Sequence, residues 1–111
     1  MSTLAKREEL LGSPPPSGGP RVLTYLRALQ EAHAEEMRRD ARVFLMGEDL
    51  SGDFFGLSGA LLKEFGAERV RDTPISEATM TGVAAGAAMA GMRPIFDFTC
   101  AAFWNHFFPS W

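Results

Sequence analysis

The chain has 111 residues, which is enough for one small domain with a modest core. Its hydrophobic fraction of 46% and charged fraction of 23% are those of an ordinary globular protein. The net charge of −3 offers no basic surface, so we expect no nucleic-acid partner.

The first 20 residues predict a disordered leader. The run Gly12–Pro20 reads GSPPPSGGP, the composition of a flexible or polyproline linker, and there is no apolar core of a secretory signal. The single cysteine, Cys100, excludes an internal disulfide and fits a reducing compartment, so we expect a cytoplasmic protein. Its apolar neighbours predict a small core residue rather than a nucleophile. Without CxxC or HExxH, a metal site built by this chain alone is not expected.

The first half of the remaining chain predicts a helix and then a buried strand. Thr24 can cap a helix that runs to about Arg39. Arg42–Met46 is a continuous apolar run that suits a buried parallel strand, and Gly47-Glu48-Asp49 follows it. Acidic residues at the carboxyl end of such a strand mark either a ligand site or a polar loop, and position alone leaves the two equal. The apolar face of the helix is expected to contain Tyr25, Leu29, Ala32, His33 and Met37, with His33 at the edge of the core.

The elements then alternate. Leu57–Phe65 predicts a short helix that Gly66 ends, Glu68–Asp72 an extended segment, and Arg93–Phe98 another strand. Alternating helices and strands predict an α/β fold with a parallel sheet flanked by helices.

A distinctive stretch, RDTPISEATMTGVAAGAAMAG, runs from Arg71 to Gly91. Pro74 favours an extended approach, Ser76 can cap a helix, and Glu77 would stand in its first turn. Gly82, Gly86 and Ala90 then recur every four residues and form a small-residue face that permits close packing. Two simpler explanations remain open: Glu77 would only interact with the helix dipole, and the small-residue face would only serve ordinary close packing. The stretch is too short and too poor in large apolar residues to span a membrane.

Three motifs in order resemble one family. ALQEAHAEEMRRDARVFLMGED, LLKEFGAERVRDTPISE and GVAAGAAMAGMRPI are similar to the N-terminal part of the β subunits of thiamine diphosphate-dependent 2-oxo acid dehydrogenase E1 components. These enzymes belong to the pyruvate, branched-chain and acetoin dehydrogenase complexes. The resemblance implies that residues 21–111 form part of a transketolase-like pyrimidine-binding domain, with an atypical aromatic tail from about Thr99.

The resemblance also implies the site. Glu77 would be the catalytic carboxylate that hydrogen-bonds N1′ of the cofactor's aminopyrimidine, Glu48 an acidic residue close to the cofactor, and Phe103 the aromatic that stacks on the pyrimidine ring. The cofactor would be thiamine diphosphate shared with an E1 α subunit that binds Mg²⁺. The assembly would be α2β2 and would pass its acyl group to a lipoyl-bearing E2.

After Phe98 the chain reads TCAAFWNHFFPSW, which departs from the Ala-x-Asp-Gln helix of the family. The resemblance then implies that this chain supplies at most half of an active site. Two readings follow: a β-subunit fragment of a 2-oxo acid dehydrogenase, or a truncated, non-catalytic remnant that at most associates with an α subunit. A generic nucleotide-binding module is disfavoured because neither GxGxxG nor a P-loop is present.

Overall fold

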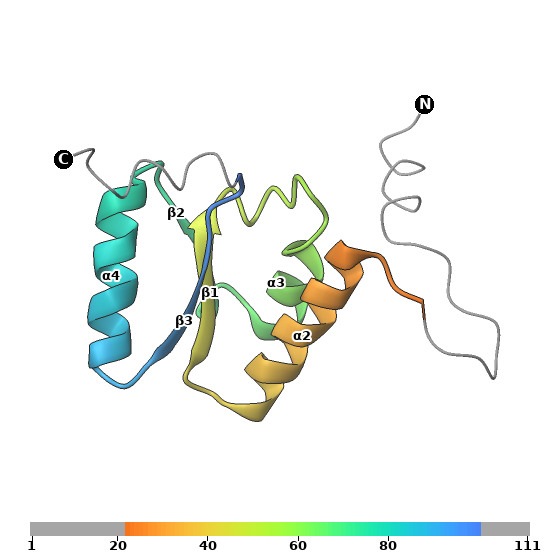
Figure 1. Ribbon diagram of the computed structural model, residues 1–111, viewed down its shortest axis with the longest axis horizontal. Helices are drawn as coiled ribbons and strands as arrows, with labels where there is room; N and C mark the ends of the chain where they lie inside the picture. Colours follow the sequence, from red (N-terminus) through yellow and green to blue (C-terminus); the bar gives the residue numbers. More distant parts are fainter. Residues whose placement is uncertain (1–21, 101–111) are drawn as a thin grey trace.

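The computed structural model describes residues 22–100 as a three-stranded parallel sheet between two helical layers (Figure 1). Helices α2 and α3 cover one face, and α4 lies on the other. This arrangement confirms the predicted α/β class and agrees with a partial transketolase-like pyrimidine-binding domain. The leader 1–20, Phe103 and the rest of 101–111 lie outside the described residues. The elements are α2 (Tyr25–Arg39), β1 (Val43–Glu48), α3 (Gly59–Phe65), β2 (Val70–Thr73), α4 (Glu77–Met89) and β3 (Arg93–Asp97).

Strand β1 lies at the centre of the sheet, which has the order β2-β1-β3. Leu45 pairs with Val70 on one side and with Ile95 on the other, and both ladders are parallel. Every β1 residue but the last is buried, as expected for a continuous apolar run between two strands.

Helix α2 begins where the sequence predicts, because the Thr24 hydroxyl accepts a hydrogen bond from the Arg27 amide at 3.2 Å. Its buried face agrees only in part with the predicted one. Met37 is buried, as predicted, whereas Tyr25 is 82% exposed and Ala32 is exposed too. Ala34 and Gln30 are buried instead, and the Gln30 side-chain amide donates to the carbonyls of Gly56 and Leu57, which ties α2 to the loop before α3.

Helix α3 begins two positions later than predicted, at Gly59 rather than Leu57. The preceding loop holds Ser58 out of the helix. Its amide donates to Asp53 Oδ1 at 2.9 Å, and its hydroxyl donates to the Leu50 carbonyl at 2.6 Å. The end was predicted correctly: Gly66 has a φ of 75°, which glycine adopts without the steric cost of a side chain.

One hydrophobic core joins α2, α3, β1 and β2. Arg69 fastens the polar edge of this core, because its guanidinium donates to the carbonyls of Met37, Asp40 and Val43 where α2 turns into β1. Seven buried residues form the core: Ala34, Met37, Val43, Leu45, Leu50, Leu61 and Val70.

Helix α4 is different, because within the described part of the chain none of its residues is buried. A Cβ built on Gly82 or Gly86 would meet no other atom of the described residues within 4 Å. The small-residue face of the helix is therefore open, as an approach by another backbone requires.

The segment after β3 corrects one prediction. Cys100 is exposed, so it is not the small core residue that its apolar neighbours predicted. The strand ends at Asp97, and Thr99 takes a left-handed conformation with a φ of 63° that turns the chain out of the sheet.

Candidate functional site

The polar ends of the strands meet at the carboxyl edge of the sheet. Glu48 closes β1 and pairs with Thr73, the last residue of β2, while Gly47 pairs with Asp97, the last residue of β3. Since parallel strands end at one edge, residues far apart in the sequence come together there, where open α/β sheets bind their ligands.

Gly47 allows β3 to lie unusually close to β1. A Cβ at this position would stand 2.5 Å from the carbonyl oxygen and 2.9 Å from the Cβ of Asp97. No side chain fits at such distances without a shift of the β3 backbone. The Met-Gly-Glu sequence therefore fixes where Asp97 lies at the edge.

Glu48 and Glu77 are close enough to influence each other. Burial raises the pKa of the half-buried Glu48 carboxyl, and the negative charge of Glu77 raises it further. A hydrogen bond from the Ser76 backbone acts in the opposite direction. The structure thus brings together two of the three site residues predicted from the sequence, and the third, Phe103, lies outside the described residues.

Glu77 is the first residue of α4, as predicted, and Ser76 stands at the N-cap. The expected capping bond is absent, however: the Ser76 side chain accepts no hydrogen bond from the first turn among the described residues. Its ψ of 65° departs from the extended conformation usual for a capping serine. Pro74 and Ile75 are both exposed, so the chain enters α4 over the surface.

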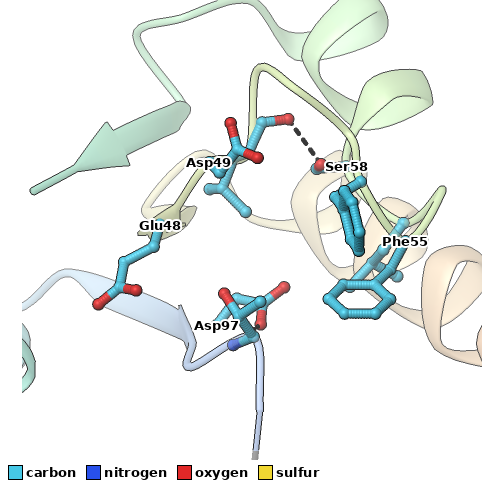
Figure 2. A pocket seen from close by; sticks show the side chains of 9 residues that line it. Glu48, Asp49, Phe55, Ser58 and Asp97 are labelled. Carbon is cyan, nitrogen blue, oxygen red and sulfur yellow. Dashed lines mark hydrogen bonds between the residues drawn. The ribbon is translucent and has the colours of Figure 1, made fainter. Parts of the chain in front are cut away.

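A cavity of ≈ 260 Å³ opens beside this edge, between the end of β1 and the loop before α3 (Figure 2). Figure 2 shows Asp97 below the cavity, with Phe55 and Ser58 on the side away from Glu48. The Glu48 carboxylate is directed away from Phe55, so it does not point into the aromatic side of the cavity. Lining residues are Glu48, Asp49, Leu50, Phe54, Phe55, Leu57, Ser58, Asp97 and Thr99.

The aromatic wall of this cavity is exposed to solvent. Phe54 and Phe55 are 81% and 51% exposed and meet edge to face, with ring centroids 5.0 Å apart. Their loop is fastened to β2 by Asp72, which accepts a hydrogen bond from the Ser51 amide at 2.8 Å. This bond lowers the pKa of the Asp72 carboxyl.

Thr73 and Asp97 are members of this edge that the sequence reasoning missed. The Thr73 hydroxyl is buried and has no hydrogen-bond partner in the described part of the chain, although buried hydroxyls are normally paired. Thr73 directly follows the predicted segment Glu68–Asp72, and Asp97 is the penultimate residue of the predicted strand Arg93–Phe98, so the rule that singled out Glu48 could have found both.

Neither a metal cluster nor a membrane span appears in the part of the chain that the structure describes. Among residues 22–100 no three His, Cys, Asp or Glu side chains are grouped so that they could hold a metal ion. No helix in the same range is both long and apolar enough to cross a bilayer.

The chain is a parallel α/β unit with a carboxylate, Glu77, at the start of the helix that follows β2. The family model described as "Transketolase, pyrimidine binding domain" matches residues 21–110. The chain therefore belongs to the transketolase pyrimidine-binding domain family.

Within that class the chain is similar to β subunits of 2-oxo acid dehydrogenases, which confirms the resemblance in the sequence motifs. It is 48% identical over 84 residues to the 2-oxoisovalerate dehydrogenase subunit beta of Bacillus subtilis (strain 168), covering 74% of this chain and 26% of that relative. It is 47% identical over 85 residues to the mitochondrial pyruvate dehydrogenase E1 component subunit beta-2 of Oryza sativa subsp. japonica, covering 74% and 22%. The pyruvate dehydrogenase E1 component subunit beta of Rhizobium meliloti (strain 1021) is 49% identical over 79 residues, covering 69% and 17%. The chain thus spans about a quarter or less of the length of these relatives.

Proposed function

We propose that this chain provides the pyrimidine side of a thiamine diphosphate site in a 2-oxo acid dehydrogenase E1, as a β-subunit chain, with Glu77 as its catalytic carboxylate. The observation that carries the proposal is the place of Glu77: the first turn of α4, beside Glu48, at the carboxyl edge of a pyrimidine-binding-type sheet. A helix start holds a carboxylate in one orientation, as proton sharing with a ring nitrogen requires.

The groups at the edge fit an aminopyrimidine. Such a ring presents N–H groups, and the edge offers two carboxylates and the buried hydroxyl of Thr73, which lacks a partner among the described residues. Glu77 would accept or share the proton at N1′, and Glu48 would stand close to the ring. Phe103 would stack on it.

The chemistry divides between cofactor and protein. When bound, the cofactor supplies the carbon nucleophile that adds to a 2-oxo group and accepts the electrons released as carbon dioxide leaves. The protein's task is to hold a proton at the Glu77 carboxylate in line with N1′, which sets the basicity of the amino group on the opposite side of the ring. A carboxylate is suited to this task because its affinity for a proton is easily tuned by neighbouring charge.

The diphosphate and Mg²⁺ call for a partner. Within residues 22–100 no Lys or Arg side chain lines the cavity at the carboxyl edge, and its rim carries Glu48, Asp49 and Asp97. Such a rim repels phosphate. We therefore propose that an E1 α subunit binds Mg²⁺ and the diphosphate, in an α2β2 assembly that passes its acyl group to a lipoyl-bearing E2.

Calorimetric titration tests the proposal directly. The full 111-residue chain is mixed with an E1 α subunit and titrated with thiamine diphosphate in the presence of Mg²⁺. Binding should require both proteins, and Glu77→Gln should weaken it while leaving the association of the two chains unchanged. Glu68→Gln, an exposed change of the same kind, is the control.

A chimaera tests the catalytic role. Residues 22–98 of this chain replace the matching segment of the Bacillus subtilis β subunit, and decarboxylation is followed with its α subunit. Glu77→Gln should lower kcat by about 10²–10⁴-fold, the usual worth of a positioned acid–base group. Two results together would support the non-catalytic alternative instead. The chain would associate with the α subunit without binding the cofactor, and Glu77→Gln would leave the turnover of the chimaera unchanged.

A further inference from the structure

We propose that the cavity between Phe55 and Asp97 is a docking site for residues 101–111 of this same chain, with the indole of Trp104 inserted into it. The inference concerns the aromatic side of the carboxyl edge, and it does not depend on the function proposed above for Glu77.

The first step of the argument is the aromatic wall of the cavity. Phe54 and Phe55 are 81% and 51% exposed in the described part of the chain, and their rings meet edge to face. Their loop is fastened in place, because the Gln30 side-chain amide donates to the carbonyls of Gly56 and Leu57. The rings cannot turn inward without loss of these bonds. Their apolar surface therefore leaves water only when another group covers it.

The second step is the size and the chemistry of the cavity. A dry cavity of about 150 Å³ binds benzene, so the ≈ 260 Å³ found here leaves room for the larger indole ring. The wall is aromatic, while Asp49 and Asp97 carry carboxylates that accept hydrogen bonds. A tryptophan suits both features, because its side chain joins a large apolar ring to one N–H donor.

The third step is the place and the composition of residues 101–111. Thr99 itself lines the cavity, and Trp104 follows it by five residues, a span of at most about 17 Å. Residues 101–111 contain no Asp, Glu, Lys or Arg, so the acidic rim does not repel them and their docking buries no charge. Five of these 11 residues are aromatic: Phe103, Trp104, Phe107, Phe108 and Trp111.

The proposed docking is compatible with the place proposed above for Phe103. Neighbouring residues of an extended segment point to opposite sides, so Trp104 can enter the cavity while Phe103 faces the Glu48 side. The Glu48 carboxylate is directed away from Phe55 (Figure 2). The indole and the cofactor ring would then lie on different sides of the end of β1.

Fluorescence quenching by acrylamide tests the docking, because Trp104 and Trp111 are the only two tryptophans of the chain. In Trp111→Phe, Trp104 is the single emitter. Its quenching constant should be about threefold lower in the folded chain than in the urea-unfolded chain, because a docked indole is shielded from the quencher. Phe55→Ala should raise the constant to the unfolded value. Met89→Ala, which removes an exposed apolar side chain from α4, should leave it unchanged.

Two variants keep the test independent of folding defects. Phe54→Ala removes the second ring of the same wall and should also raise the quenching constant of Trp104. Both rings are largely exposed, so neither change removes a core contact, and circular dichroism verifies the fold of each variant.

Three results would overturn the proposal. A Trp104 that is quenched in the unaltered cavity as readily as in the unfolded chain would show that the cavity is open to another ligand. A low constant that persists in both phenylalanine variants would place the indole elsewhere. A constant that rises on dilution would show that residues 101–111 of a second copy, rather than of the same chain, fill the cavity.

Discussion

His33 lies on α2 at the edge of the core, half-buried, and its Nδ1 has no hydrogen-bond partner among the described residues. Burial lowers the pKa of this imidazole, and the charge of Asp97 offsets part of the effect. The folded protein therefore prefers the neutral ring more strongly than the unfolded chain does.

The sign of the resulting pH dependence follows from this preference. The folded-state pKa lies below the unfolded value of about 6.5, so the contribution of His33 is complete above that pH and is lost as the pH falls through the lower folded value. We predict that the free energy of unfolding falls in this window and that His33→Leu removes this part of the slope. Urea titrations at several pH values measure it, with His106→Gln as the control. An unaltered slope in His33→Leu would contradict the prediction.

At the scale of the elements, the space around glycine differs between β1 and α4. At Gly47 the backbone of β3 occupies the space of a side chain, whereas at Gly86 the described residues leave that space open. The two positions permit one substitution to be compared in two settings.

We predict that Gly47→Ala destabilises the fold by about 1–3 kcal/mol, because β3 must move away from β1 to accommodate the methyl group. Gly86→Ala should instead stabilise it by about 0.5–1 kcal/mol, because alanine loses less conformational entropy in a helix interior. Chemical denaturation measures both. Equal effects of the two changes would show that β1 and β3 are not held as closely as described.

At the scale of the whole molecule, the two faces of the sheet are covered to different degrees. Helices α2 and α3 share a core with the strands, while Met89 and Val83 on α4 are 90% and 49% exposed. The strands at both edges of the sheet, β2 and β3, also offer backbone groups for further pairing. The isolated chain should therefore associate with itself and dissolve poorly.

We predict that Met89→Lys reduces this self-association, measured as the weight-average mass in sedimentation velocity across a concentration series. Ala28→Lys adds the same charge at an exposed position of α2 and should have a smaller effect. A monodisperse monomer with a sharp cooperative melt in the unaltered chain would contradict the expectation of poor solubility.

Local patterns in the sequence determined the kinds and order of the elements. The apolar run of β1, the caps at Thr24 and Gly66, and the break at Pro74 act over a few residues, so each can be read without knowledge of the fold. The TPISE motif likewise placed Glu77 at a helix start. The same local rules failed where the partner lay elsewhere in the chain, as at Gln30, whose amide is satisfied by the loop before α3.

Only the tertiary structure decided which polar groups meet. Glu48 lies close enough to Glu77 for the two charges to interact because β1 pairs with β2 in one register, and Asp97 lies at the same edge because Gly47 admits the β3 backbone. It also showed that the Ser76 side chain makes no capping bond within residues 22–100 and that Cys100 is exposed. The sequence thus determined the elements and the family motif, because they depend on neighbouring residues. The geometry of the edge depends on strand register and packing between distant segments, which no local pattern contains.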